Sequence, residues 1–424
     1  MRVLIVNTSE KTGGAAVAAN RLMEALNNNG EKARMLVRDK DTGDINVNEV
    51  PRRLLRKWTF IFERLIIFVR TFFRREHLFE IDIANSGYDI TKTKEFREAD
   101  VIHLHWVNQG LLSLGGVRKI LDSGKAVVWT MHDLWPATAI CHYAGTCMRF
   151  KSRCHHCPLL PAGGHDNDLS ARVWRRKQRC YEGRNVQFVT CSRWLGGEAR
   201  QSALLRGQDI TCIPNAIDTR VFRPKDKAEA RKAVGIGAVG NVILFVSQKV
   251  TDERKGMHYF IEAVRMLVGQ HPEMRENTAI AVLGGHSEDI VRELPLTTFP
   301  LGYISDDEAI VNVYSSADVF VLPSMQDNLP NTVMEAMACG VPCVGFKVGG
   351  IPEMIDHLTT GYVSAPADAA DLAKGIWYVL NEADRDVLRQ NALRKVSAKY
   401  SQRAVALKYI EVYNKAIAYK RYKI

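Results

Sequence analysis

Residues 318–353 read DVFVLPSMQDNLPNTVMEAMACGVPCVGFKVGGIPE, and no other stretch says as much about the fold. The apolar run Asp318–Pro323 predicts a buried strand, followed by a polar loop and a helix that begins near Asn331. The loop carries Asp327, and the first turns of the helix carry Glu335, eight residues further on. A strand, a loop and a helix in this order are typical of α/β proteins with parallel sheets.

The two carboxylates are predicted to lie beside the start of a helix. Backbone N–H groups point outward at a helix N-terminus and favour an anion. Carboxylates accept hydrogen bonds from hydroxyl groups, so a ligand with phosphate at one end and hydroxyls at the other fits this arrangement. A nucleotide-sugar is such a ligand. In a chain with 47 acidic residues, however, two carboxylates at this spacing are common by chance.

The whole segment resembles the donor-site signature of retaining glycosyltransferases with the two-domain GT-B fold, in particular the large family 4 group. That signature contains Pro-Ser, a Glu, then Glu-Ala-Met-Ala, Gly-x-Pro, and Gly-Gly followed by Glu. The matching residues here are Pro323-Ser324, Glu335-Ala336-Met337-Ala338, Gly340-Val341-Pro342, Gly349-Gly350 and Glu353. The sequence departs from the family at Asp327, where most members carry Glu. Aspartate keeps the charge but has a reach shorter by one methylene.

Composition indicates an ordinary soluble protein of 424 residues, long enough for two or more domains. The net charge of +11 is confined to the first half, because residues 1–215 hold 33 Lys and Arg against 22 Asp and Glu. No secretory signal is recognisable at the N-terminus, and the nine cysteines favour a reducing compartment. We therefore expect a cytoplasmic protein whose first half is attracted to an anionic surface.

Strand-like and helix-like segments alternate along both halves of the chain. Helices are expected after Gly14 and over Met257–Val268. The strand candidates are Arg2–Asn7, Ala33–Arg38, Val101–Trp106, Ala126–Met131, Val186–Cys191, Ile210–Ile213, Val242–Ser247, Ala279–Leu283, Val319–Leu322 and Cys343–Phe346. This alternation predicts an α/β protein with two Rossmann-like, doubly wound parallel sheets. The resemblance implies the GT-B fold, in which the two domains face each other across a cleft.

The resemblance also implies where the domains begin and end. Residues 213–218, Ile-Pro-Asn-Ala-Ile-Asp, are similar to the segment with which the family crosses between domains. We expect residues 1–215 to bind the acceptor, residues 216–400 to bind the nucleotide-sugar donor, and the helix in 401–424 to return to the first domain.

Most of the expected donor contacts follow from the resemblance. Lys255-Gly256 matches the family's Lys-Gly, so Lys255 is expected to bind the donor diphosphate, together with Arg254. The family's usual Arg falls near Gln248 in this chain. Glu335 is expected to hold the ribose hydroxyls, Asp327 the sugar. The backbone is expected to contact the sugar near Asn328 and Leu329, and the base near Tyr303.

Fixed cations stabilise the leaving diphosphate without a metal, so we expect no cofactor to be required for catalysis. The chain does contain Asp-x-Asp triplets like those of the metal-dependent glycosyltransferase fold, but without supporting context. They are Asp39–Asp41, Asp166–Asp168 and Asp384–Asp386.

The first domain carries two further candidates: His132 is expected to take part in catalysis, and Gly13 and Gly14 are expected to help bind the donor. His132-Asp133 follows the predicted strand Ala126–Met131 and matches the family's Thr-x-His-Asp, which lies near the reacting sugar. Gly13 and Gly14 lie between the first strand and the first helix, where the backbone can approach a ligand closely. His103 and His105 share one face of a strand, and we expect both to be structural, with His105 nearer to the cleft. The Gly-x-Gly-x-x-Gly at residues 235–240 precedes a strand, so it is interpreted as a turn.

Four cysteines lie close together after the His-Asp motif, at Cys141, Cys147, Cys154 and Cys157. Four thiolates in one loop are a ligand set for tetrahedral Zn²⁺, and in the cytosol zinc is favoured over disulfides. The spacing is not that of a standard zinc finger, so ordinary thiols remain the alternative. The place of the insert suggests a lid over the acceptor.

Residues 51–75, PRRLLRKWTFIFERLIIFVRTFFRR, are basic and aromatic at once. Apolar residues recur at helical spacing, among them Leu55, Trp58, Phe62, Leu65, Val69, Phe72 and Phe73, with charges at 56, 57, 63, 64, 70 and 74. The run is too short to span a bilayer. We expect the helix to lie in an anionic membrane interface with its arginines toward the headgroups, the alternative being a helix packed on protein. No nucleic-acid-binding module accompanies this charge.

These features together predict a retaining glycosyltransferase of surface-polysaccharide assembly at the inner face of the membrane. Its donor is expected to be a nucleoside-diphosphate sugar and its acceptor a saccharide, on a polyprenyl-diphosphate carrier. Two alternatives stay open: a nucleotide-sugar epimerase of the same fold, and a non-catalytic partner that binds nucleotide-sugar, which Asp327 and Gln248 allow. A Rossmann oxidoreductase is disfavoured by the misplaced glycine motif.

Overall fold

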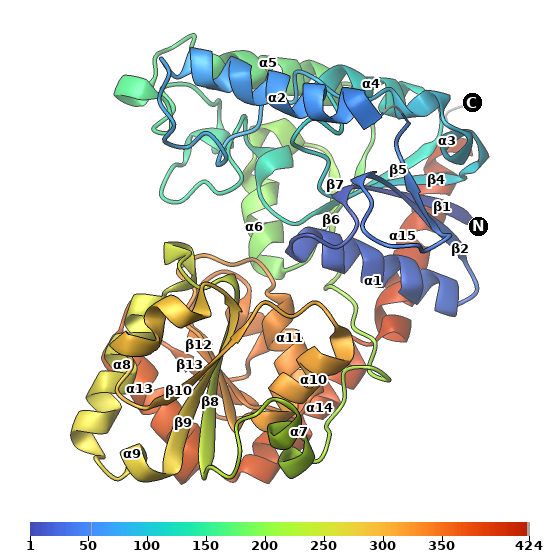
Figure 1. The fold of residues 1–424 in the computed structure, drawn as a ribbon. Coiled ribbons are helices and arrows are strands. Elements are labelled where there is room, and N and C mark those ends of the chain that lie inside the picture. The colour runs from blue at the N-terminus through green and yellow to red at the C-terminus, as the bar shows by residue number, and fades with distance from the viewer. Residues whose placement is uncertain (52, 422–424) are drawn as a thin grey trace. The chain divides into compact units, whose positions relative to one another are not determined.

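The computed structural model describes residues 1–51 and 53–421, without the side chains of residues 53–56 and 421 (Figure 1). The chain divides into two compact units. The first comprises Met1–Pro214 and the C-terminal residues from Val405 onward, and the second comprises Asn215–Ala404. The sequence placed this division after residue 215 and the return of the chain after residue 400.

The first unit contains a seven-stranded sheet with the order β3-β2-β1-β4-β5-β6-β7. All neighbouring strands are parallel, so their carboxyl ends share one edge of the sheet. The strands are β1 (Arg2–Ser9), β2 (Lys32–Asp39), β3 (Val47–Glu49), β4 (Val101–Leu104), β5 (Ala126–Met131), β6 (Gln187–Thr190) and β7 (Asp209–Cys212).

Helices cover both faces of this sheet, so its strands are buried on both sides. The helices are α1 (Gly14–Asn28), α2 (Arg53–Arg70), α3 (Lys94–Glu98), α4 (Leu114–Asp122), α5 (Leu169–Tyr181), α6 (Arg193–Gln201) and α15 (Gln402–Arg421). On one face α2, α4 and α5 lie over the sheet, and Ile67, Val117 and Trp174 pack into a core with Leu4 and Leu104. On the other face lie α1 and α15.

The second unit repeats the design with a six-stranded parallel sheet of order β10-β9-β8-β11-β12-β13. Its strands are β8 (Asn241–Lys249), β9 (Thr278–Gly285), β10 (Thr297–Gly302), β11 (Val319–Leu322), β12 (Cys343–Phe346) and β13 (Gly361–Ser364). The helices are α7 (Lys227–Ala233), α8 (Met257–Gln270), α9 (Met274–Asn277), α10 (Asp307–Ser316), α11 (Asn331–Ala338), α12 (Ile351–Met354), α13 (Ala369–Trp377) and α14 (Arg385–Lys399). A core of α8 and α13 side chains covers one face.

The predicted α/β class with two doubly wound parallel sheets is confirmed. Residues 235–240 form the turn between α7 and β8, with φ of 74° at Gly235 and 71° at Gly237. Three strands were not predicted. β3 has three residues, β10 contains Pro300, which an edge strand tolerates, and β13 begins with Gly361. None of these segments shows the apolar run that identifies a buried strand.

The C-terminal helix α15 is attached to the first sheet by buried polar side chains. The Tyr413 hydroxyl lies 2.7 Å from Nδ1 of His103, and Nε2 of the same imidazole lies 2.8 Å from Oγ1 of Thr130. The Tyr409 hydroxyl lies 2.9 Å from the same Oγ1. His103 is fully buried, which lowers its pKa from 6.5 to about 3, and the charge of His132 adds to this effect. The structural role expected for His103 therefore agrees with its surroundings.

We predict that the first unit loses stability as the pH falls below 6.5. Below this pH the unfolded His103 binds a proton, whereas the folded residue stays neutral down to a pH of about 3. The free energy of unfolding should thus fall by about 1.4 kcal/mol per pH unit through this histidine alone.

His103→Gln should reduce this pH dependence, because the amide still forms hydrogen bonds but does not titrate. The dependence that remains comes from groups such as His105 and His132, whose pKa values burial also lowers. Urea unfolding at pH 7 and pH 5 measures the difference. Tryptophan fluorescence reports mainly on the first unit, which holds six of the seven tryptophans. Equal slopes in the two proteins would contradict the assignment.

Candidate functional site

The order of the second sheet reverses between β8 and β11, which are neighbours. In open α/β sheets, ligands bind outside the carboxyl ends of the strands at this topological switch point. The chain leaves β8 into a loop that holds Arg254 and Lys255, and leaves β11 into the loop that holds Asp327. The fold therefore brings the predicted diphosphate and sugar residues to the two sides of one switch point.

These two loops are joined by polar contacts. The Lys255 ammonium lies 2.6 Å from Oδ2 of Asp327, and both side chains are mostly buried. The Arg254 guanidinium donates to the carbonyl of Gln326 at 3.0 Å, and the N–H of Met325 donates to the carbonyl of Arg254 at 2.9 Å. The residues expected to bind diphosphate thus hold the residue expected to bind the sugar.

The loop after β12 packs against the loop after β11 through a backbone contact that requires glycine. Gly349 has φ of +56°, and a Cβ added there would lie 1.7 Å from the carbonyl oxygen of Asp327. The N–H of Gly350 donates to that carbonyl at 3.3 Å. At the β8 loop, a Cβ on Gly256 would lie 2.0 Å from the carbonyl oxygen of Pro323. The glycines of the matched motif therefore allow three loops to pack against one another.

Glu335 lies in the second turn of α11, and the helix begins at Asn331 as the sequence predicted. Its carboxylate is 9% exposed, and its Oε2 accepts a hydrogen bond from the Tyr314 hydroxyl at 2.9 Å. Tyr314 lies on α10 and is fully buried. The sequence did not predict this partner. A tyrosine on the buried face of a helix fits the apolar periodicity whether or not its hydroxyl forms a hydrogen bond.

The remaining donor candidates divide into two groups. Asn328 and Leu329 follow Asp327 in the same loop and are 5% and 7% exposed. Tyr303 follows β10, the far edge strand, and its side chain is 64% exposed. The structure therefore gathers the predicted donor residues of the second unit, except Tyr303, around β8, β11 and α11, whereas Gly13 and Gly14 lie in the first unit.

The first unit has its own switch point, between β1 and β4. Gly13 ends the loop after β1 with φ of +93°, and α1 begins at Gly14 without a side-chain cap. Open space lies around the position of a Cβ at Gly13. His105 follows β4 and His132 follows β5, so the candidates of this unit also gather at the carboxyl edge of its sheet.

His132 is held by neighbours on the adjacent strands. Its Nε2 lies 2.9 Å from Nδ1 of His105, and its Nδ1 lies 3.6 Å from Sγ of Cys191. Burial lowers the pKa of His132 from 6.5 to about 4, against the opposing effect of Asp133. The imidazole is therefore neutral at pH 7. Nε2 of His105 is buried without a hydrogen-bond partner, which places an unpaired nitrogen beside His132.

Asp133 anchors a buried charge network that the sequence did not reveal. Its Oδ2 accepts from Nε1 of Trp106 at 2.9 Å and lies 2.7 Å from Nδ1 of His142. Nε2 of His142 lies 2.7 Å from Oδ2 of Asp82, which also pairs with Arg64 on α2. Burial opposes charge on His142, but the two aspartates raise its pKa to about 10. The network thus links the His-Asp motif to α2.

Comparison with known protein families decides the class of this chain. The family model described as Glycosyltransferase Family 4 matches residues 12–221, and the model described as Glycosyl transferases group 1 matches residues 226–395. The chain is a glycosyltransferase. The first match falls almost wholly in the first unit and the second lies within the second unit.

Known relatives of this glycosyltransferase are distant. A D-inositol 3-phosphate glycosyltransferase of Saccharomonospora viridis is 26% identical over 357 residues, which cover 78% of this chain and 74% of the relative. An uncharacterised glycosyltransferase of Methanocaldococcus jannaschii is 26% identical over 366 residues, covering 80% and 90% of the two chains.

Solved structures support the GT-B fold of the glycosyltransferase. Sucrose-phosphate synthase of Thermosynechococcus elongatus matches with a TM-score of 0.65 at 20% identity, covering 99% of each chain. Anabaena HepE in complex with UDP and glucose matches with a TM-score of 0.62 at 15% identity, covering 98% of this chain and 100% of HepE. At these identities the likeness establishes the fold alone.

We predict that Gly349→Ala destabilises the glycosyltransferase by about 2–4 kcal/mol, because the new Cβ meets the Asp327 carbonyl in a backbone conformation that disfavours alanine. Urea unfolding followed by circular dichroism measures the change. Gly269→Ala is the matched control. Gly269 lies in α8 with open space around it, so alanine there should stabilise by up to about 1 kcal/mol. Equal effects at the two positions would contradict the close approach at Gly349.

Proposed function

We propose that the protein is a retaining glycosyltransferase that moves a hexosyl group from a nucleoside-diphosphate sugar to a saccharide acceptor. The observation that carries this proposal is the arrangement at the second switch point. There Lys255 and Asp327 form an ion pair 2.6 Å long, with Arg254 in the same loop and Glu335 in the following helix. Cations and hydroxyl acceptors lie side by side, as a ligand with a diphosphate and two sugar rings requires.

In this proposal Lys255 and Arg254 bind the diphosphate and stabilise the charge that develops on it as the sugar leaves. Asp327 accepts hydrogen bonds from the donor sugar, and Glu335 accepts them from the ribose. Lys255 and Asp327 pair with each other, so a donor that separates them must supply a phosphate to Lys255 and hydroxyls to Asp327. Neither charge is then left buried and unpaired.

The first unit is proposed to bind the acceptor. His132, neutral at pH 7, can accept a hydrogen bond from an acceptor hydroxyl once one of its ring nitrogens leaves His105 or Cys191. Gly13 leaves room for a sugar to approach the backbone of its loop. The names of relatives support a nucleotide-sugar donor, since HepE was solved with UDP and glucose and another relative is a D-inositol 3-phosphate glycosyltransferase.

Incubation of the purified protein with a panel of UDP- and GDP-sugars separates this proposal from its alternatives. Release of nucleoside diphosphate that depends on a saccharide acceptor supports transfer. Conversion of the donor without an acceptor indicates an epimerase. Donor binding without turnover indicates a non-catalytic partner and overturns the proposal.

We predict that Glu335→Gln lowers kcat/KM for the donor by about 10- to 100-fold, because hydrogen bonds from the ribose to a charged carboxylate are lost. The amide keeps the size of the side chain and can still accept from Tyr314, so stability should change little. Glu308→Gln on α10 is the control, with a side chain 81% exposed. Full activity of Glu335→Gln would contradict the assigned ribose contact.

The acceptor is proposed to be carried on a membrane lipid, because α2 turns an apolar face outward. The residues of this face are between 46% and 76% exposed: Trp58 at 67%, Ile61 at 50%, Phe62 at 49%, Leu65 at 52%, Val69 at 46%, Phe72 at 76% and Phe73 at 67%. The first five form one stripe along α2 by their helical spacing, and Phe72 and Phe73 follow the end of the helix. The sequence also predicted Leu55 on the apolar side of the helix and Arg56 on the charged side. Both side chains lie outside the described part of the structure.

The opposite face of α2 corrects the sequence prediction. Glu63 and Arg64 were expected on the polar, headgroup-facing side, but they are 0% and 6% exposed and join the buried network with Asp82. The prediction that Arg64 points toward headgroups is wrong, because its side chain packs on the protein and pairs with Asp82. Lys57, Arg70, Arg74 and Arg75 remain exposed around the apolar stripe.

Two aromatic residues at the end of α2 are held in an unfavourable backbone conformation. Phe72 and Phe73 have φ of 55° and 62°, which bulky residues rarely adopt. Such strain is common at functional sites. Aromatic rings flanked by arginines favour an anionic membrane interface over a neutral one. No helix among the described residues is long and apolar enough to cross a membrane.

We predict that Phe62→Ser, Phe72→Ser and Phe73→Ser combined reduce binding to vesicles that contain phosphatidylglycerol by at least about tenfold, from the loss of buried apolar area. Co-sedimentation with vesicles measures the bound fraction. Val387→Ser on α14 removes an apolar residue of similar exposure, 52%, from the second unit and should have no effect. Unchanged binding by the triple variant would contradict the membrane-facing stripe.

A further inference from the structure

The connection from β5 to α5 is long for a compact unit and has little regular structure. Residues 132–168 are all described, and they contain three-residue 3-10 turns at Trp135–Ala137, Arg149–Lys151 and Pro161–Gly163. Long connections of this kind need ties other than backbone ladders. Phe150 supplies one tie, since it is buried in the core of the first unit.

Four cysteines of this connection meet at one cavity. Cys141, Cys147, Cys154 and Cys157 all line a cavity of about 60 Å³. All four are free thiols. Cys157 is 9% exposed and the other three are partly buried. Residues separated by up to 16 positions thus line the same small space.

We propose that these four cysteines bind one Zn²⁺ ion, which fixes the connection against the sheet. Thiolates are soft ligands that select zinc, and four of them complete the closed tetrahedral shell of a structural site. On binding, each thiol releases its proton to water as its sulfur coordinates the metal, and no electron is transferred. The inference does not depend on which sugar the enzyme transfers.

The surroundings supply the charge that such a centre needs. Zinc with four thiolates carries a net charge of −2. The buried Lys177 ammonium lies beside the cavity, where its Nζ donates to the carbonyls of Trp135 and, at 3.1 Å, of Thr138, a residue of the cavity wall. Arg149 also lines the cavity. Two cations are thus available to offset the two negative charges.

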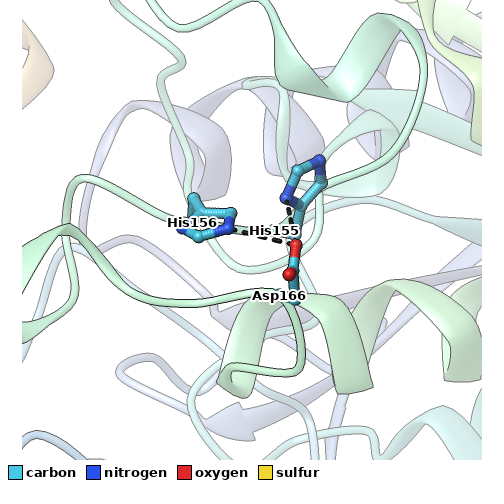
Figure 2. A group of neighbouring side chains, drawn as sticks. All are labelled: His155, His156 and Asp166. Atoms are coloured by element: carbon cyan, nitrogen blue, oxygen red, sulfur yellow. Dashed lines mark hydrogen bonds and ion pairs between the residues drawn. The ribbon is translucent and has the colours of Figure 1, made fainter.

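A second group of ligand-type side chains lies in the same connection. Figure 2 shows His155 and His156 on either side of the Asp166 carboxylate. Among the described residues these three form the one group whose ligand atoms all lie within 4.8 Å of one another. Their Asp166 contacts are 3.6 Å and 3.1 Å, and the Asp166 side chain is 89% exposed. This is the geometry of solvated ion pairs rather than of an enclosed metal shell.

Zinc binding requires the four sulfurs to draw together. With zinc–sulfur bonds of about 2.3 Å, tetrahedral sulfurs lie about 3.8 Å apart. The regular structure of the connection is limited to three-residue 3-10 turns, and we propose that zinc draws the sulfurs to this spacing. The type of coordinating atom distinguishes the two candidate ligand sets. The four cysteines coordinate through sulfur, and the His155, His156 and Asp166 group coordinates through nitrogen and oxygen.

The proposed metal would stabilise the segment next to the His-Asp motif. Cys141 forms an antiparallel bridge with Ile81, and the N–H of Asp82 donates to the carbonyl of Ile140 at 2.8 Å. The adjacent His142 lies 2.7 Å from both Asp82 and Asp133. Fixing Cys141 therefore fixes the neighbour that orients Asp133.

The test is the zinc content of the full chain, purified without chelator and measured by inductively coupled plasma mass spectrometry. We expect about one zinc ion per chain, with an X-ray absorption spectrum of four sulfur neighbours at about 2.3 Å. The absence of zinc, or a shell of nitrogen and oxygen atoms, would overturn the proposal.

Variants then separate the two ligand sets. Cys154→Ser with Cys157→Ser should remove the zinc, whereas Cys212→Ser, a thiol on β7, should retain it. His155→Asn, His156→Asn and Asp166→Asn combined should also retain it. Loss of zinc from the His and Asp variant but not from the Cys variant would assign the metal to the surface group instead. Should the Cys variant fail to fold, the wild-type spectrum alone decides.

Discussion

The ion pair between Lys255 and Asp327 is the interaction on which the candidate donor site depends. It joins the loop after β8 to the loop after β11 across the switch point of the second sheet, at a distance of 2.6 Å. Removing one partner from a mostly buried pair leaves a charge without compensation, which is more costly than the pair itself is stabilising. A donor with phosphate and hydroxyl groups can replace both partners at once. In the proposed function, this pair is the reason that the site selects ligands carrying both chemistries.

The first unit also contains a buried network of charged side chains. Its buried charges form pairs, since Arg64 faces Glu63 and Asp82, and His142 lies between Asp82 and Asp133. Because this network takes Glu63 and Arg64 of α2 into the protein, the aromatic side of the helix is left outside. The outward apolar face and the orientation of Asp133 thus have one structural cause. The same network connects the surface proposed for the membrane to the loop proposed for the acceptor.

The sequence predicted the fold and most of the site because both depend on local patterns. Strands such as Ala126–Met131 are apolar runs, and α11 begins at Asn331 after a proline. The sequence did not reveal contacts made through tertiary structure, such as Tyr314 with Glu335 or His142 with two aspartates. It also misplaced Arg64, since helical spacing identifies two faces of α2 but not which one packs inward. The roles of the gathered residues remain proposals.

A crystal structure of the protein with UDP or GDP tests the central claim most directly. The account predicts density for the two phosphates beside Lys255 and the start of α11, and for the pentose hydroxyls at the Glu335 carboxylate. Lys255 should then have left Asp327 for the phosphates. Nucleotide bound elsewhere, with the Lys255–Asp327 pair intact, would contradict the account.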